Sequence, residues 1–186
     1  TRYSEGVGHG TNLAGTIAGH TQSFAGIAPD ARLVSVKVAD RQGVSDVSQV
    51  IAGIDWVVGH AHSDGLNIRV LNLSFGTDSA QSYQLDPLAY AAEQAWHQGI
   101  VVVVSVGNTG RSLGRLTDPA IDPFVLAVGA AATSGDSLKV ARCSAGWNGQ
   151  TTPGLVAPGS HTASRQPFDR EAANEAGARA RQATGW

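Results

Sequence analysis

The stretch "IVVVVSVGN" (residues 100–108) decides the fold class of this chain. A strand so uniformly apolar needs cover on both faces, as a strand has inside a parallel sheet with helices packed against it. Two neighbouring strands are predicted at "IRVLNLSF" (68–75) and "FVLAVGA" (124–130). A fourth is predicted at "RLVSVKVA" (32–39), which is rich in β-branched residues and lies between turn signals.

Helical patterns separate these strands. Residues 46–60 repeat apolar side chains at i, i+3, i+4 and i+7, which predicts an amphipathic helix with Ser45 as its N-cap. A second helix is predicted to begin with Asp86 as N-cap and Pro87 as its first residue, and to end at Gly99. Its predicted buried face consists of Leu88, Ala91, Ala92, Ala95 and Trp96. Strands that alternate with helices predict an α/β fold, here a three-layer sandwich with a mostly parallel central sheet.

The composition of the 186 residues excludes several function classes. A formal net charge of −2, without a basic stripe, argues against a nucleic-acid partner. The single cysteine, Cys143, excludes an internal disulfide and a cysteine-based metal site, and the histidines lack metal-ligand spacing, so no cofactor is expected. No apolar run is long enough to span a membrane, and no signal peptide is visible. Residues 165–186 form a charged, alanine-rich tail whose structure the sequence leaves open.

Near the start of the chain, "GHGTNLAGTIAG" (8–19) combines a histidine with more glycine than an ordinary helix contains. A helix that begins at His9 would anchor one face through Leu13 and Ile17, and would leave another face almost without side chains. Such a face lets neighbouring backbone approach closely. His9 would then stand at the helix N-terminus, either as a general base or as a residue that only caps a tightly packed helix, and the local pattern favours neither.

Two of the predicted strands end in glycine at the edge of the sheet where open α/β folds bind their ligands. After Gly107, the amide of Asn108 could donate a hydrogen bond to a developing oxyanion, although a turn residue is the more ordinary interpretation of that position alone. Gly76 ends "LNLSFG" (71–76) and would leave a backbone edge to which an extended peptide could add as a strand.

In this order the segments resemble the subtilisin-like serine peptidases, the subtilases of peptidase family S8. "GHGTNLAGTIAG" is similar to the family's histidine motif, "LNLSFG" to its substrate-binding strand and "VVVVSVGN" to its oxyanion strand. "DPFVLAVGA" and "LVAPG" (155–159) match two later landmarks, so the resemblance covers residues 7–160. It implies a serine endopeptidase that hydrolyses peptide bonds with a Ser-His-Asp triad.

The resemblance also implies roles for individual residues. His9 would be the general base of the triad, and Asn108 would donate its side-chain amide to the tetrahedral oxyanion. Two walls of the substrate cleft and its S1 pocket would be formed by Ser74, Phe75 and Gly76 and by Ser105, Val106 and Gly107. The family further implies a peptide or protein substrate, a monomeric parent protein and an extracellular location. A structural calcium occurs in the family, but nothing in this sequence indicates one.

The chain also departs from the family pattern. Asn12 stands where the family has a second histidine, and Gly154 where many members have an aspartate. The aspartate motif D-[ST]-G and the serine motif G-T-S-x-A are both absent from the 186 residues. We therefore expect residues 1–186 to be a partial catalytic domain, truncated at both ends and inactive by itself, from a parent that is an active peptidase. The alternative is a degenerate subtilase fold that binds peptides without cutting them.

Overall fold

The computed structural model describes residues 8–22, 24–40, 42–110, 115–134, 137–146 and 153–160. These described residues belong to two compact units, which are divided in the sequence after Gly53. The alanine-rich tail (165–186) lies outside the described residues.

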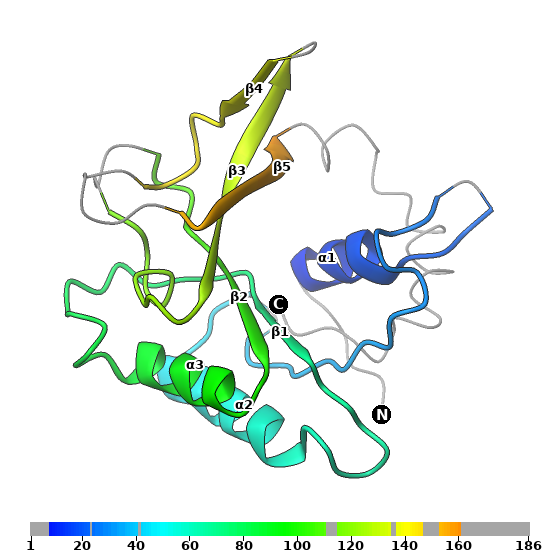
Figure 1. The fold of residues 1–186 in the computed structure, drawn as a ribbon, viewed down its shortest axis with the longest axis vertical. Helices are drawn as coiled ribbons and strands as arrows, with labels where there is room; N and C mark the ends of the chain where they lie inside the picture. The colour runs from blue at the N-terminus through cyan, green and yellow to red at the C-terminus, as the bar shows by residue number, and fades with distance from the viewer. Residues whose placement is uncertain are drawn as a thin grey trace. The chain divides into compact units, whose positions relative to one another are not determined.

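The second unit is built on a mostly parallel sheet (Figure 1). In it, β1 (Val70–Leu73), β2 (Val101–Ser105) and β3 (Leu126–Ser134) lie side by side in this order and run parallel. The antiparallel strand β4 (Ser137–Val140) pairs with β3, and β5 (Leu155–Ser160) pairs with β3 in parallel orientation. The α/β class with a mostly parallel sheet is therefore confirmed, together with three of the four strands predicted from the sequence.

The central strand β2 lies in the core, although its two faces are not covered equally. Val102 and Val104 are 0% and 1% exposed, whereas Val101 is 41% exposed. This alternation follows from the period of two along a strand, which sends successive side chains to opposite faces. The buried face packs against α3 (Pro87–His97). The prediction of full cover on both faces is therefore wrong at the start of this strand.

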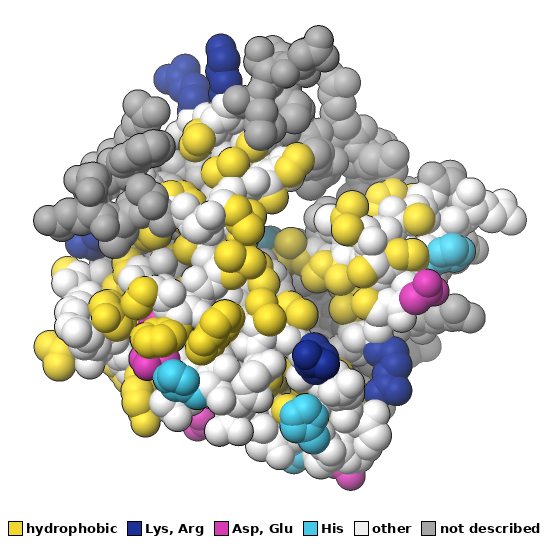
Figure 2. All heavy atoms as spheres, viewed as in Figure 1, with side chains coloured by type: hydrophobic (Ala, Val, Ile, Leu, Met, Phe, Trp, Pro, Cys, Tyr) yellow, Lys and Arg dark blue, Asp and Glu magenta, His cyan; other side chains and the backbone are white. Residues whose placement is uncertain are grey.

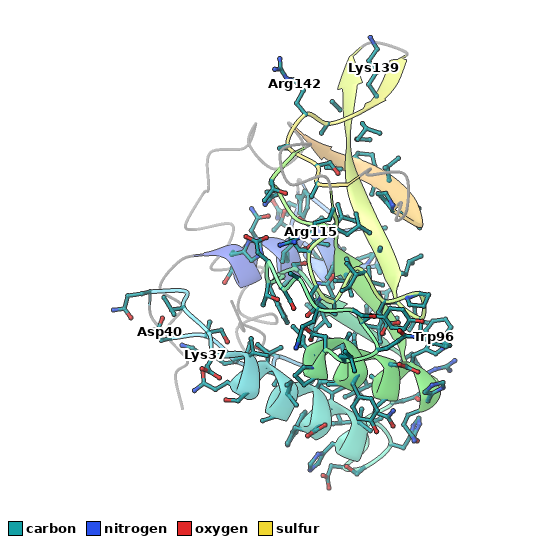
Figure 3. The ribbon with its side chains drawn as sticks, turned by 90° about the vertical axis from the view of Figure 1, so that its left-hand side faces the viewer. Lys37, Asp40, Trp96, Arg115, Lys139 and Arg142 are labelled. Carbon is teal, nitrogen blue, oxygen red and sulfur yellow. The ribbon has the colours of Figure 1, made fainter. Side chains whose placement is uncertain are left out.

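Apolar side chains also reach the surface over β3 and β5 on the face shown in Figure 2. Among the strand residues, Val140 of β4 is 49% exposed and Leu155 of β5 is 42% exposed. The cations Lys139 and Arg142 lie at the far end of this region, beyond the apolar side chains (Figure 3). The described sheet therefore presents a mixed surface with apolar area open to solvent.

The helix α3 begins as the sequence predicts. Asp86 is its N-cap, and its Oδ1 accepts hydrogen bonds from the backbone N–H groups of Leu88 at 2.9 Å and Ala89 at 3.4 Å. The buried face consists of Leu88, Ala89, Ala91, Ala92 and Ala95. Trp96 was predicted on this face, but it is 40% exposed and points away from the body of the unit (Figure 3). One residue is a turn of about 100° around a helix, which carries Trp96 past the buried stripe that ends at Ala95.

The first unit contains α1 (His9–Ala18) and the first half of α2 (Val47–His60). Residues 32–39 were predicted as a strand, yet they pair with no strand among the described residues. Their β-branched side chains favour extended backbone, but a strand also needs the hydrogen bonds of a partner. This segment packs on α2 instead, because a Cβ on Gly53 would lie only 2.8 Å from Cγ1 of Val38.

The start of α2 differs by one residue from the prediction. Ser45 does not cap the helix, because its hydroxyl donates to the carbonyl of Val38 at 2.6 Å. Asp46 directly precedes the helix, and its Oδ1 accepts from the N–H of Ser48 at 2.8 Å and from the Ser48 hydroxyl at 2.6 Å. The capping position therefore belongs to Asp46, and the predicted helix is otherwise confirmed.

Candidate functional site

The two predicted walls continue strands that are paired in register. β1 and β2 align Leu73 with Val104, at the carboxyl ends of both strands. Residues 74–76 and 105–107 directly follow these strand ends, so both segments start from the same edge of the sheet. The wall residues differ in exposure: Val106 is buried, Gly76 is exposed, and Ser74, Phe75, Ser105 and Gly107 are half-buried. The sequence and the structure therefore both put these segments at the carboxyl edge of the sheet, and their role as walls of a substrate cleft stays a prediction.

A short segment that the sequence did not single out, residues 115–118, lies between the two walls. The N–H of Thr117 donates to the carbonyl of Val106 at 3.1 Å. On its other side, Asp118 and Thr77 exchange backbone hydrogen bonds of 2.9 and 3.0 Å. The segment is therefore bonded through its backbone to the ends of both walls.

The side chain of Thr117 reaches the two glycines of the walls. A Cβ built on Gly76 would collide with Oγ1 of Thr117 and would lie 2.8 Å from its Cβ. A Cβ built on Gly107 would lie 2.5 Å from Cγ2 of the same threonine. Both positions are therefore glycine because the threonine occupies the space that a side chain would need.

Arg115 adds a third connection between this segment and the first wall. Its guanidinium donates from Nη2 to the carbonyl of Asp78 at 2.7 Å, and Figure 3 shows its position at the middle of the unit. Asp78 lies two residues beyond Gly76, so the bond holds the chain directly after the wall. The segment 115–118 is thus fixed at both of its ends.

The predicted oxyanion donor, Asn108, follows the second wall. Gly107 before it has a φ of 97°, a left-handed conformation that turns the chain out of the strand and favours glycine. The carbonyl of Gly107 accepts from the N–H of Ala145 at 2.9 Å, which holds this turn in place. The side chain of Asn108 is exposed at the edge of the sheet. Its location agrees with the predicted edge, and its role stays a prediction.

The predicted base, His9, is the first residue of α1 and is exposed, as the sequence predicts for a helix that begins there. Close backbone approach also occurs at this glycine-rich helix, because the N–H of Gly26 donates to the carbonyl of Gly19 at 2.7 Å. His9 belongs to the first compact unit and Asn108 to the second. The convergence of these two side chains on one carbonyl therefore stays a prediction.

The residue after Thr117, Asp118, carries a buried carboxyl group. Asp118 is 0% exposed, and neither of its side-chain oxygens has a hydrogen-bond donor among the described residues. Burial, the charge of Asp86 together with a hydrogen bond to it, and the charge of Asp122 raise the pKa of Asp118 to about 7. A proton on Asp118 supplies the donor that its two oxygens lack, and Asp86 is the acceptor.

The pKa of Asp86, the neighbour of Asp118, is shifted in the opposite direction. Burial by itself would raise the pKa of Asp86, but its hydrogen bonds outweigh this effect and hold the pKa below its usual range. These bonds come from the Ser79 hydroxyl at 2.8 Å and from the first N–H groups of α3. Below about pH 7, Asp86 is therefore the carboxylate of the neighbouring pair and Asp118 the carboxylic acid.

Other kinds of site receive no support from the part of the chain that the structure describes. Within it, no group of three or more His, Cys, Asp or Glu side chains is arranged to hold a metal ion. The thiol of Cys143 is exposed and free. No described helix is both long enough and apolar enough to cross a membrane.

The residues that sequence reasoning missed are Thr117 and Asp118. In the sequence, "RLTDPA" (115–120) indicates only a turn before Pro119. Their importance comes from contacts with Gly76, Gly107 and Asp86, which are distant along the chain. A signal for such contacts could come from covariation between related sequences, and a single sequence does not contain it.

Comparison with known proteins gives consistent matches. The family model described as the subtilase family, Peptidase_S8, matches residues 1–184. Serine protease AprX of Bacillus subtilis is 34% identical over 166 residues, which cover 82% of this chain and 38% of the relative. Subtilisin-like protease 1 of Trichophyton equinum is 37% identical over 164 residues, which cover 88% of this chain and 29% of the relative. The chain therefore spans about a third of the length of these relatives.

A solved structure, that of Sphericase, resembles the fold. It superposes with a TM-score of 0.61 and 24% sequence identity, over 75% of this chain and 45% of the other. At this identity the likeness supports the fold, and it agrees with the predicted α/β class.

Proposed function

Because this chain belongs to the subtilase family of serine peptidases, we propose that the complete protein is a serine endopeptidase and that these residues supply its general base and oxyanion donor. The substrates would be peptides or proteins held in extended conformation. The alternative is a degenerate subtilase fold that binds peptides without cutting them. In line with the family resemblance, we also propose that the complete protein acts outside the cell and as a monomer.

One observation carries the proposal: two glycine-containing segments, the proposed walls, follow β1 and β2 at the same edge of the sheet, and an exposed asparagine directly follows the second. An extended peptide can add to the exposed backbone edge at Gly76 by strand pairing. A peptide bound in this way would have its side chain before the scissile bond directed between the walls. Its carbonyl would then lie near the edge at which Asn108 stands.

The chemistry assigned to each side chain follows from its functional groups. His9 would take the proton from a serine hydroxyl as it attacks the carbonyl, and would return that proton to the leaving amine. The side-chain amide of Asn108 would donate a hydrogen bond to the oxyanion of the tetrahedral intermediate. The serine and the orienting aspartate have no matching motif in the 186 residues, so we propose that other parts of the complete protein contribute them.

The first test replaces the oxyanion donor. Asn108→Ala in the complete protein is expected to lower kcat by about 10²–10³-fold with little change in KM; that magnitude is the one known for this donor in subtilisin itself, a member of the same family, and is carried over from it. Asn67→Ala is the matched control, because Asn67 is an exposed asparagine outside both walls. An equal kcat for the Asn108 variant and the wild-type protein would remove Asn108 from the mechanism.

A second measurement separates the proposal from the non-catalytic alternative, which rests on the departures at Asn12 and Gly154. A fluorophosphonate labels a serine that an adjacent base activates. The complete protein is expected to be labelled, and His9→Ala is expected to abolish the labelling. A complete protein that binds peptides but takes no label would instead establish the peptide-binding module.

A further inference from the structure

The space between the two walls is occupied at the level of their glycines. Gly76 and Gly107 have no side chains, so a group from a third segment can lie between them. The branched side chain of Thr117 does so: a Cβ on Gly76 would lie 2.8 Å from its Cβ, and a Cβ on Gly107 would lie 2.5 Å from its Cγ2. A substrate side chain that enters between the walls therefore meets this threonine.

Thr117 is also firmly held in that position. Its N–H bonds to Val106 of one wall at 3.1 Å, and the next residue, Asp118, exchanges two backbone hydrogen bonds with Thr77 after the other wall. As a β-branched residue, threonine has few accessible χ1 rotamers. The backbone of Thr117 is therefore fixed at the walls, and its side chain has few alternative orientations.

The hydroxyl of Thr117 gives a second, independent indication that a ligand belongs here. Thr117 is 7% exposed, and its Oγ1 has no hydrogen-bond partner among the described residues. Buried hydroxyl groups are normally paired. A small polar side chain that enters between the walls as far as Thr117 would bring its own hydroxyl close to this unpaired oxygen.

We propose that Thr117 limits the pocket between the walls to small side chains, so that the enzyme cleaves after residues such as serine and alanine and rejects large aromatic residues. This inference rests on the proposed function and adds a substrate class to it. Thr117 acts here as a specificity-determining residue, since it forms the end of the pocket and takes no part in the bond-breaking steps.

The experiment measures kcat/KM of the complete protein on peptide substrates that differ only in the residue before the scissile bond: alanine, serine or phenylalanine. The wild-type enzyme is expected to prefer alanine to phenylalanine by about 100-fold or more, as for a pocket that is several methylene groups too small. Thr117→Gly is expected to reduce this preference at least tenfold, mainly by improving cleavage after phenylalanine. Thr117→Ala is the second opening variant, with a smaller cavity, in case the glycine variant folds poorly.

The matched control is Thr117→Val, which retains the branched shape and removes only the hydroxyl. Its preference for alanine over phenylalanine is expected to equal that of the wild-type enzyme. Its preference for serine over alanine is expected to fall, because the hydrogen-bond partner is lost. This pair of variants separates the size of the pocket from its polarity.

The outcomes separate the two levels of the proposal. A wild-type enzyme that cleaves well after phenylalanine, or opened variants that fold and keep the wild-type preference, would overturn the role of Thr117 and leave the peptidase activity standing. Failure of the complete protein to cleave any of the peptides would overturn the proposed function and this inference with it.

Discussion

Two helix N-termini of this protein are built in opposite ways. The start of α3 is buried and specified by side chains: Asp86 is 5% exposed, accepts the first N–H groups of the helix and receives the Ser79 hydroxyl. The start of α1 has Gly8 at its N-cap position with a φ of 84°, and no side-chain capping bond is made. Its first residue, His9, is exposed.

The two helix starts match two different tasks: the start of α3 stabilises the fold, and the start of α1 presents the side chain that we propose as the general base. A carboxylate cap saturates the N–H groups at the end of a helix and fixes where the helix begins. A glycine cap provides less stabilisation but leaves the first side chain uncrowded, which suits the proposed role of His9 as general base. The α3 start should therefore be sensitive to substitution and pH, whereas α1 should tolerate or even benefit from better helix formers.

The largest expected effect concerns pH at the α3 start. The native pKa of Asp118 is about 7 and its ordinary value is 3.8, so the folded protein binds a proton that the unfolded chain releases between these values. This stabilising contribution is present in full below about pH 4 and is lost as the pH rises to about 7. Three pKa units correspond to a loss on the order of 4 kcal/mol.

The variant Asp118→Asn isolates this contribution, because an amide can donate to Asp86 at every pH. The free energy of unfolding, measured by urea titration from pH 4 to pH 8, should rise for the variant relative to the wild-type protein as the pH increases. The difference should level off above about pH 7. A difference that does not depend on pH would show that Asp118 is ionised in the folded state.

The next effect is loss of the cap itself. Asp86→Ala is expected to lower the free energy of unfolding by about 1–2 kcal/mol, because two N–H groups of α3 and the Ser79 hydroxyl lose their acceptor. Asp46→Ala removes the exposed cap of α2 and should cost less, since water replaces the lost bonds there. Equal losses in the two urea titrations would contradict the special position of α3.

The smallest effect is expected in α1. Gly15→Ala should raise the free energy of unfolding by about 0.5–1 kcal/mol, because nothing lies within 4 Å of the added Cβ and alanine is the better helix former. The control Gly19→Ala should be destabilising, since its Cβ would lie 2.5 Å from the carbonyl oxygen of Gly15. If Gly15→Ala also destabilises, another segment must use the bare face of this helix.

Much of the fold could be predicted because its signals are local. The apolar period of α2, the Asp-Pro start of α3 and the valine run of β2 each identify an element within a few residues. Errors arose where a local pattern competes with distant partners. Residues 32–39 have the composition of a strand but no ladder among the described residues, and the Ser45 hydroxyl bonds to Val38 instead of capping α2.

The same contrast between local patterns and distant contacts applies to the candidate site. Both walls could be placed at one edge of the sheet, because strands that end in glycine in a parallel sheet share their carboxyl edge. The segment that closes the space between them could not, because its threonine is recognised only by contact with Gly76 and Gly107. Local sequence thus indicates where we propose that a substrate binds, and distant contacts carry the proposal about how large its side chain can be.

The adjacent residues Thr117 and Asp118 have opposite surroundings, as successive residues of extended backbone do: the threonine faces the wall glycines, and the carboxyl faces the cap of α3. A deletion of one residue ahead of them would therefore move Asp118 into the position that faces the wall glycines, and Pro119 into the position that faces the cap of α3. A carboxylate would then face the bound peptide, and arginine or lysine would become the preferred residue before the scissile bond. In the proposed pocket, the deletion of a single codon would therefore replace selectivity for the size of a side chain with selectivity for its charge.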